Sequence, residues 1–270
     1  MTQALSISSH VAYGPVGNSA AVPAMEWLGV TVHAIPTVVL SNHPGHGRPA
    51  GLRVPARDLA AIADALEALG VLDACTGVMT GYFAADEQIH CVANAIRQLK
   101  RRRPQVFYLC DPVLGDDPAG LYVPESVAAA IRDELLPLAD AITPNRFELE
   151  WLSGHSVGCR EDAMVGARKL AVPSLIATSI PAEPNRLLTL LIDAGGVTQV
   201  ETARRPAVPH GTGDFLSGLF LGYRLLGREG PAALRASVAA VERVIEASTG
   251  GTVLNLAAFR LAGADHDFAP

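Results

Sequence analysis

Gly77-Val-Met-Thr80 and Val106-Phe-Tyr-Leu-Cys110 are two short apolar runs on either side of a longer segment, Asp86–Lys100, in which apolar residues recur with helical period. Short apolar runs of this kind are typical of buried strands, whereas a long run of helical period predicts an amphipathic helix. A strand, a helix and a second strand in this order indicate a βαβ unit with parallel strands. The pattern then repeats, because a helical segment at Pro124–Leu136 leads to a third short run at Ala141–Thr143.

The alternation of short apolar runs and helical segments extends over most of the chain. Further strands are predicted at Ala4–Ile7, Thr31–Leu40, Leu175–Thr178, Leu187–Ile192 and Val197–Glu201. Further helices are predicted at Asn18–Leu28, Val54–Leu69, Glu148–Leu152 and Cys159–Leu170. This order predicts an α/β fold, a three-layer sandwich in which a mostly parallel central sheet carries helices on both faces. In such a sheet, ligands bind at the carboxyl ends of the strands.

The last third of the chain departs from this alternation. Two β-rich runs flank the Gly-rich turn Asp193-Ala-Gly-Gly196, which predicts a hairpin of antiparallel strands. Two helices follow at Asp214–Leu226 and Pro231–Ser248, with Gly227 placed to end the first and Pro231 to start the second. No repeat, low-complexity segment or linker divides the sequence. We therefore expect one domain that spans residues 1–270.

The composition restricts the classes of protein to consider. Of the 270 residues, 49% are apolar and 18% are charged, which is enough apolar material for a sizeable core without disulfides or structural metals. The formal net charge of −6 argues against a nucleic-acid binder, since Lys100-Arg-Arg-Arg103 is the only basic run. That run ends a predicted helix, where positive charge stabilises the negative end of the helix dipole.

The sequence also bears on the compartment. No apolar run approaches the ~18 residues that a membrane span requires, and no basic segment precedes an apolar one at the N-terminus. The cysteines form no CxxC pair and no metal-finger spacing, so we expect reduced thiols. They are Cys75, Cys91, Cys110 and Cys159. We therefore expect a cytoplasmic protein without a membrane partner.

The segment with the most chemistry is His210-Gly-Thr-Gly-Asp214, which opens an unusually apolar helical stretch. A helix N-terminus presents unpaired backbone N–H groups and a partial positive charge, and glycines let a phosphate approach that backbone closely. An aspartate there can take the proton of a hydroxyl group while the backbone stabilises a transferred phosphoryl group. The combination indicates a small-molecule kinase. The alternative is structural, in which the glycines form a turn and Asp214 is a plain N-cap.

Polar residues follow other predicted strands and are candidates for the same edge of the sheet. Asp111 follows one central strand, and Thr143 and Asn145 follow the next, with Glu148 one helical turn later. Carboxylate oxygens bind Mg²⁺ directly or through its water molecules, so Asp111 and Glu148 are candidate metal ligands. Each also has a structural explanation, because Asp-Pro favours a turn and Asn145 with Glu148 resembles a capping box. Further residues at strand ends are Thr178, Ser179 and Tyr82.

Several of these segments together resemble the motifs of one known family, the pyridoxal kinases of the ribokinase-like superfamily. The matching motifs are Ser8-Ser-His-Val-Ala-Tyr-Gly-Pro-Val-Gly-Asn18, Ser41-Asn-His43, Thr80-Gly-Tyr82, Cys110-Asp-Pro-Val-Leu-Gly-Asp116, Thr143-Pro-Asn-Arg-Phe-Glu148 and Gly211-Thr-Gly-Asp214. The first motif is fairly specific to pyridoxal kinases, whereas the last marks only the superfamily. The resemblance implies a ribokinase-like fold and ATP-dependent phosphorylation of the 5′-hydroxymethyl group of pyridoxal. The product is pyridoxal 5′-phosphate, in vitamin B6 salvage.

The resemblance also implies roles at the catalytic centre and around the nucleotide. Asp214 matches the base that activates the substrate hydroxyl. The matching residues of the anion hole are Gly211, Thr212 and Gly213. The residues that match positions around the phosphates of ATP and Mg²⁺ are Asp111, Asp116, Thr143, Asn145 and Glu148. Thr178 and Ser179 match a strand end that contacts the nucleotide.

The pyridoxal side of the site is implied in the same way. Ser9 matches a hydrogen-bond partner of the pyridine ring, and Val16 and Tyr82 match residues that line its faces. Tyr122 matches a residue on a flap over the site, and His43 matches the family motif beside the substrate. A flat aromatic substrate is expected to need apolar walls and a few polar anchors of this kind. The resemblance further implies a homodimer that uses MgATP, with a monovalent cation as a possible helper.

Two departures from the family pattern stand out. After Ser41-Asn-His43, pyridoxal kinases commonly carry Thr and a polar residue that contact the substrate, but this chain has Pro44-Gly-His-Gly47. The choice among pyridoxal, pyridoxine and pyridoxamine is therefore open. Several bacterial relatives place a Lys beside the nucleotide where this chain has Ser179, so the contacts with ATP must differ there.

Two alternatives remain open on the sequence alone. One is a hydroxymethylpyrimidine kinase, whose substrate is also a flat ring with a hydroxymethyl group. Those relatives usually carry Cys where this chain has Asp214, which weighs against them. The other is a non-catalytic pyridoxal-binding relative, to which the altered loop Pro44–Gly47 points.

Overall fold

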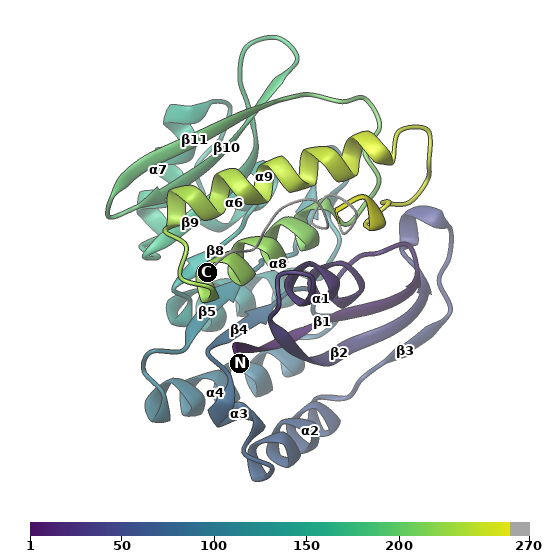
Figure 1. Ribbon diagram of the computed structural model, residues 1–270, viewed down its shortest axis with the longest axis vertical. Coiled ribbons are helices and arrows are strands. Elements are labelled where there is room, and N and C mark those ends of the chain that lie inside the picture. The colour runs from purple at the N-terminus through teal and green to yellow at the C-terminus, as the bar shows by residue number, and fades with distance from the viewer. Residues whose placement is uncertain (260–270) are drawn as a thin grey trace.

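A nine-stranded sheet forms the centre of the described chain, residues 1–259 of a computed structural model (Figure 1). The strand order is β11-β10-β9-β8-β5-β4-β1-β2-β3. The bounds are β1 (Gln3–Tyr13), β2 (Thr31–Asn42), β3 (Gly51–Arg53), β4 (Gly77–Thr80), β5 (Phe107–Cys110), β8 (Ala141–Ile142), β9 (Ser174–Pro181), β10 (Arg186–Asp193) and β11 (Gly196–Ala203). Strands β2, β1, β4, β5, β8 and β9 run parallel, so their carboxyl ends meet along one edge.

Helices cover both faces of this sheet (Figure 1). One face carries α1 (Asn18–Glu26), α8 (Thr212–Leu225) and α9 (Gly230–Ala247). The other carries α2 (Ala56–Ala68), α3 (Val71–Ala74), α4 (Asp86–Arg102), α5 (Glu125–Ala130), α6 (Arg146–Ser153) and α7 (Arg160–Leu170). Successive strand residues point to opposite faces: Ala4 and Met79 pack with the first group of helices, and Leu5 and Val78 with the second. The predicted three-layer sandwich is confirmed.

Several element boundaries differ from those predicted. The predicted helix Pro124–Leu136 is α5 followed by a π-helical turn, Ile131–Leu135, and a 3-10 turn, Leu136–Leu138. The hairpin at the Gly-rich turn is confirmed as β10 and β11, which pair antiparallel. The prediction missed β3 and a small hairpin of β6 (Gly115–Asp116) and β7 (Gly120–Leu121). These strands are only two or three residues long, too short for a periodic pattern to show.

Helices α1 and α8 approach each other closely through two glycines of α8. A Cβ atom on Gly218 would lie 2.6 Å from the backbone oxygen of Ala21, and one on Gly222 would lie 2.8 Å from the Leu28 side chain. Any larger residue at Gly218 would therefore force the two helix backbones apart. This close packing fixes the start of α8 against the loop that leads into α1.

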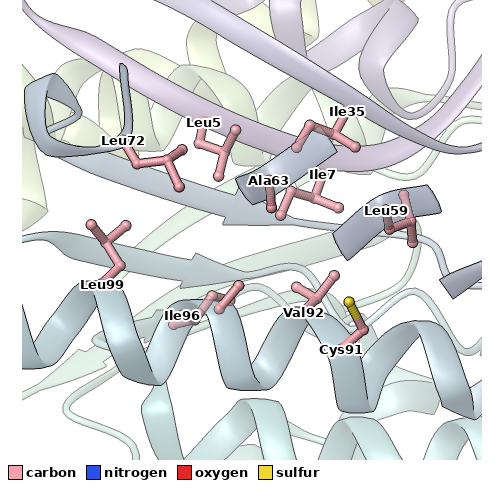
Figure 2. A pocket seen from close by; sticks show the side chains of 11 residues that line it. Leu5, Ile7, Ile35, Leu59, Ala63, Leu72, Cys91, Val92, Ile96 and Leu99 are labelled. Carbon is pink, nitrogen blue, oxygen red and sulfur yellow. The ribbon is translucent and has the colours of Figure 1, made fainter. Parts of the chain in front are cut away.

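The packing between the sheet and helices α2 and α4 leaves a small apolar cavity of about 20 Å³ (Figure 2). Side chains from β1, β2, α2 and α4 point into it, among them Ile7, Ile35, Leu59 and Ile96. The lining has no exposed polar surface. A cavity with such walls is expected to be dry, because a water molecule there would find no hydrogen-bond partner.

Replacement of Ile96 by Ala is expected to lower the free energy of unfolding by about 3 kcal/mol. Ile96 is only 2% exposed and already borders the cavity, so its loss enlarges a space that the helices do not close. Chemical denaturation measures the effect. Ile96→Val is the matched control and is expected to cost about 1 kcal/mol. Equal effects of the two variants would contradict this account of the packing.

Candidate active site

The carboxyl edge of the parallel strands gathers most of the residues that the sequence singled out. Most of them lie just after the end of a strand or at the start of α8, and Ser9 lies within β1, which continues to Tyr13. They are Ser9 on β1, His43 after β2, Tyr82 after β4, Asp111 after β5, Thr143 after β8, and Gly211, Thr212, Gly213 and Asp214 at the start of α8. Asp116 and Tyr122 lie on and beside the small hairpin of β6 and β7. Segments far apart in the sequence thus meet at one edge.

The N-terminus of α8 is capped by a residue without a side chain. Gly211 is the N-cap with φ 102°, and it makes no side-chain capping hydrogen bond to the first turn. The backbone N–H groups of Thr212 and Gly213 precede the first helical hydrogen bond and are therefore donors for a ligand. Asp214 is the third helical residue, so the alternative in which it is a plain N-cap is wrong.

Two glycines bring the start of α8 against the loop that follows β1. A Cβ atom on Gly211 would lie 2.0 Å from the backbone oxygen of Pro15, and one on Gly17 would lie 2.1 Å from the Ser9 hydroxyl oxygen. Both glycines have positive φ, a conformation that strains other residues. The backbone N–H of Gly17 faces the Asp214 carboxylate and lowers its pKa. Glycine is thus required on both sides of the Asp214 carboxylate.

Asp214 faces a second carboxyl group, that of the buried Asp111. The Ser217 hydroxyl lies 3.1 Å from Asp111 Oδ2 and 2.9 Å from Thr143 Oγ1, and so joins β5, β8 and α8. Burial, and then the negative charge of Asp214, raise the pKa of Asp111. Burial likewise raises the pKa of Asp214. No ion pair with either carboxylate occurs among residues 1–259, so a cation would stabilise both charges.

Glu148 and Asn145 form the capping box of α6, which confirms the structural explanation of this pair. Asn145 Oδ1 accepts from the Glu148 N–H at 2.9 Å, and Glu148 Oε2 accepts from the Asn145 N–H at 2.8 Å. Glu148 Oε1 accepts a third bond from the Leu114 N–H at 2.9 Å. Burial, and then the charge of Asp111, raise the pKa of Glu148 well above its ordinary value. Both carboxylate oxygens are already engaged by backbone donors, so any cation contact would be additional.

The residues predicted to contact a flat ring are Ser9 on β1, Val16 in the loop after β1 and Tyr82 after β4. Ser9 and Val16 are buried, and Tyr82 is partly buried. The backbone of Tyr82 is held at both ends, since its N–H donates to Ser8 Oγ at 3.1 Å and its carbonyl accepts from Thr37 Oγ1 at 2.7 Å. These bonds fix the backbone of Tyr82, which with Val16 and Ser9 supplies the apolar and polar residue types that suit a flat aromatic ligand.

Three histidines cluster where the 3-10 turn Pro44–His46 meets the start of α8. The rings of His43 and His210 lie 4.1 Å apart, and the His46 ring lies 6.5 Å from His43 and 6.3 Å from His210. Burial, and then the charges of His210 and His46, lower the pKa of His43 to about 4. His43 is therefore neutral at physiological pH. Sequence reasoning passed over His46 and His210 as site residues, because only the fold brings them beside His43.

Thr178 and Ser179 lie within β9 and not at its end, which corrects the prediction. The strand continues to Pro181, and these two residues face the single residue Thr189 of β10, between the pairs Ala177–Leu190 and Ile180–Leu188. Such an insertion is a β-bulge, and Ser179 adopts φ 59° in it. Thr178 bridges to Asn145, so the bulge reaches the start of α6. The bulge turns two hydroxyl-bearing residues toward the same edge.

No group of three or more His, Cys, Asp or Glu side chains among residues 1–259 is arranged to hold a metal ion. Asp111 and Asp214 are still two hard oxygen donors without a countercharge in that part of the chain. This donor set suits Mg²⁺, which keeps several of its water molecules when few protein ligands bind it. No helix of the described chain is long and apolar enough to cross a membrane.

This fold has backbone N–H donors, a carboxylate and strand-end polar groups at one sheet edge, and it defines a small-molecule kinase of the ribokinase-like superfamily. The family model for phosphomethylpyrimidine kinase matches residues 20–254. The chain belongs to the family that this model describes and, within it, to the pyridoxal kinases.

Two bacterial relatives and one solved structure support the assignment. The chain is 36% identical to pyridoxal kinase of Rubrobacter xylanophilus over 249 residues, 90% of this chain and 86% of the relative. It is 37% identical to pyridoxine/pyridoxal/pyridoxamine kinase of Bordetella pertussis over 260 residues, 93% and 92% of the two chains. Pyridoxal kinase of Leishmania donovani in complex with ADP and pyridoxine superposes with a TM-score of 0.87 at 29% identity, over 96% of this chain and 91% of the other.

Proposed function

We propose that the protein transfers the γ-phosphoryl group of ATP to the 5′-hydroxymethyl oxygen of pyridoxal, giving pyridoxal 5′-phosphate and ADP. Pyridoxine and pyridoxamine carry the same hydroxymethyl group and are expected to be further substrates. The bacterial and structural relatives support this assignment through their own activities and ligands. The expected role is vitamin B6 salvage.

One observation carries the proposal: the Asp214 carboxylate lies in the first turn of α8, beside the N–H groups of Thr212 and Gly213, which no side chain caps. The carboxylate can accept the proton of the substrate hydroxyl as that oxygen attacks phosphorus. The two N–H groups, with the N-cap Gly211, can stabilise the negative charge on the transferred phosphoryl oxygens. Base and anion hole are thus supplied by four consecutive residues.

The ring of the substrate is expected to lie between the side chains that flank this turn. We assign Val16 and Tyr82 to its two faces and Ser9 to a hydrogen bond with the pyridine ring. The neutral His43 imidazole is expected to contact a polar substituent, and Tyr122, which is 48% exposed, to cover the ring from the flap. These assignments rest on the burial of Ser9 and Val16 and on the place of these residues near the edge of the sheet at which α8 begins.

The nucleotide is expected along the strand ends on the other side of Asp214. The residues we assign to ATP and its phosphates are Asp111, Asp116, Thr143, Asn145, Glu148, Thr178 and Ser179, with the backbone of 211–213. Asp111 would hold Mg²⁺ and Glu148 would contact it only through water, because backbone donors occupy both Glu148 oxygens. Mg²⁺ would supply positive charge to the phosphate oxygens. A monovalent cation is a further expected helper.

The remaining expectations concern the whole protein. We propose that the chain is one domain, that it works in the cytoplasm and that two copies form a homodimer. The nine-stranded sheet that runs through the described chain supports the first of these. The bacterial kinase relatives support the cytoplasmic location, and the homodimer rests on the family resemblance alone.

A second candidate function is phosphorylation of hydroxymethylpyrimidine. It is favoured by the description of the family model that matches residues 20–254. The pyrimidine carries three ring substituents and pyridoxal four. The presence of Asp at position 214, where such kinases usually carry Cys, weighs against the pyrimidine. In both substrates the hydroxymethyl group is carried by a flat six-membered aromatic ring.

An assay of ADP formation decides between them. Purified protein is given MgATP with pyridoxal, pyridoxine, pyridoxamine or hydroxymethylpyrimidine, and kcat/KM is compared. We expect the highest value for one of the three B6 vitamers and formation of pyridoxal 5′-phosphate from pyridoxal. A higher kcat/KM for the pyrimidine would replace the proposed function with the second one.

A further inference from the structure

The hairpin of β6 and β7, with Tyr122 after it, forms a flap of residues 115–122 that lies beside the predicted nucleotide residues. It carries two of the residues assigned above, Asp116 and Tyr122. The hairpin itself pairs only Gly115 with Leu121 and Asp116 with Gly120. Two such pairs hold little of the structure in place. Something outside the hairpin must therefore fix its position.

The start of α6 provides those contacts, one after another along the flap. Glu148 Oε1 accepts from the Leu114 N–H at 2.9 Å, just before the flap, and Asn145 Nδ2 donates to the Gly115 carbonyl at 2.8 Å. The Phe147 ring packs against Gly115 so closely that a Cβ atom there would lie 2.6 Å from it. The base of the flap is thus fixed to α6.

The tip of the flap is held by one residue of α6. Arg146 Nε donates to Asp117 Oδ2 at 2.6 Å, and Arg146 Nη2 donates to Asp117 Oδ1 at 2.5 Å. Two parallel bonds between a guanidinium and a carboxylate fix orientation as well as distance. The Arg146 side chain is 21% exposed and that of Asp117 is 48% exposed, so only the guanidinium side of the pair is shielded from water.

The Arg146 guanidinium also donates hydrogen bonds to two further acceptors. Arg146 Nη1 donates to Glu150 Oε2 at 2.9 Å and to the Val157 carbonyl at 3.0 Å. Glu150 Oε2 in turn accepts from the Val157 N–H at 2.9 Å. Because these bonds already fix the guanidinium, the Arg146 side chain loses little conformational entropy when it pairs with Asp117. The pair is therefore stronger than an ordinary surface ion pair.

The charge of Arg146 matters as much as its geometry. Asp116 and Asp117 are neighbours on a flap that is assigned to an anionic nucleotide. The pKa of Asp116 is raised by burial, and the charge of Asp117 raises it further. Arg146 compensates one of these two carboxylates. Without it, the flap would bring two uncompensated negative charges to the phosphates.

We propose that Arg146 is a positioning residue that holds the flap down through Asp117, so that Asp116 and Tyr122 lie over the bound nucleotide and substrate. We call the ion pair between Arg146 and Asp117 the latch. The expected change in kinetics rests on the proposed function, but the latch itself is a property of the free protein. It assigns to the segment Asn145–Glu148 a second task, the anchoring of the flap, besides its contacts with the nucleotide.

Two variants test the pair from either side, Arg146→Lys and Asp117→Asn. Lysine keeps the charge and loses the fork, whereas Asn keeps the shape and loses the charge. Each is expected to raise KM for ATP about five- to ten-fold, with kcat changed less than about three-fold, since the flap contributes to binding before chemistry. The double variant is expected to show the same KM as either single variant, because each breaks one and the same contact.

The control uses an ion pair of the same kind elsewhere. Arg132 donates to Asp133 through Nε at 2.7 Å and Nη2 at 3.0 Å on an exposed surface. Asp133→Asn is expected to leave kcat and both KM values unchanged. Independent effects of Arg146→Lys and Asp117→Asn that multiply in the double variant would overturn the latch.

Hydrogen exchange of the flap amides gives a readout that needs no activity. In Arg146→Lys and Asp117→Asn, the amides of residues 115–122 are expected to exchange at least three-fold faster, while those of β4 and β5 stay as in the unchanged protein. Asp133→Asn is expected to show no such change. Unaltered flap exchange in both variants would overturn the latch. Absent kinase activity with faster flap exchange would overturn only the proposed function.

Discussion

Asp214→Asn is expected to lower kcat for pyridoxal phosphorylation by a factor of about 10² to 10⁴, the range typical for loss of a general base. The amide has nearly the shape of the carboxylate but cannot accept the hydroxyl proton. The loss of the base should lower kcat, whereas nucleotide binding should persist because the neighbouring N–H groups of Thr212 and Gly213 are unchanged. Steady-state rates of ADP formation measure the effect.

The control for this variant is Asp58→Asn. Asp58 is also the third residue of a helix, α2, but it is exposed and lies on the outer surface. It is expected to leave kcat and stability nearly unchanged. Affinity for ADP, measured by calorimetry, should change little in Asp214→Asn. A variant that retains the kcat of the unchanged protein would remove Asp214 from the role of base.

The pH dependence of the reaction follows from the same carboxylate. Burial raises the pKa of Asp214 to about 6, and a base acts only in its deprotonated form. The value of kcat/KM is therefore expected to rise with pH up to this pKa and to fall about ten-fold per pH unit below it. The Asp214→Asn variant should lack this acid limb. An acid limb that persists in the variant would belong to another group.

The position of the site was predictable because it follows from strand order. Parallel strands end at one edge, so Asp111 and Thr143 could be placed together from the apolar runs before them. The capping box of Asn145 and Glu148 was also readable, since it depends on a spacing of three residues along one helix. Local patterns of this kind need no knowledge of the tertiary structure.

Contacts between distant segments were not predictable. Ser217 joins Asp111 to Thr143 across more than 70 residues of sequence, and nothing in its neighbourhood marks it except its place one turn after Asp214. The bond from Arg146 to Asp117 and the stack of His43 on His210 are of the same kind. The small flap was missed because its strands are too short for a periodic signal.

The net charge of −6 also proved a poor guide to the anionic ligand. It disfavours extended nucleic acid, whose affinity depends on many basic side chains. A single nucleotide needs positive potential only locally. In this fold the backbone dipoles at the N-terminus of α8 supply that potential. Among residues 1–259, no basic side chain forms an ion pair with Asp111 or Asp214.

Gly211→Ala is expected to have the largest effect on folding and to lower activity as well. Gly211 adopts φ 102°, and an added Cβ atom would lie 2.0 Å from the backbone oxygen of Pro15. Neither backbone can yield cheaply, because α8 is packed closely on α1 through Gly218. We expect a loss of about 3 kcal/mol or more in the free energy of unfolding. Chemical denaturation measures this loss.

The activity of Gly211→Ala is expected to fall about 100-fold even in the folded fraction, since the N–H groups of the anion hole shift with the N-cap. For the change in stability, Gly213→Ala is the matched control. Its added Cβ atom meets no other atom within 4 Å, and it lies in the helix, where Ala is favoured over Gly. It should therefore be as stable as the unchanged protein or slightly more so. If Gly211→Ala lowers the free energy of unfolding and Gly213→Ala raises it, glycine is needed at 211 for close contact with Pro15, and not for flexibility of the loop. Equal stability changes in the two variants would contradict that explanation.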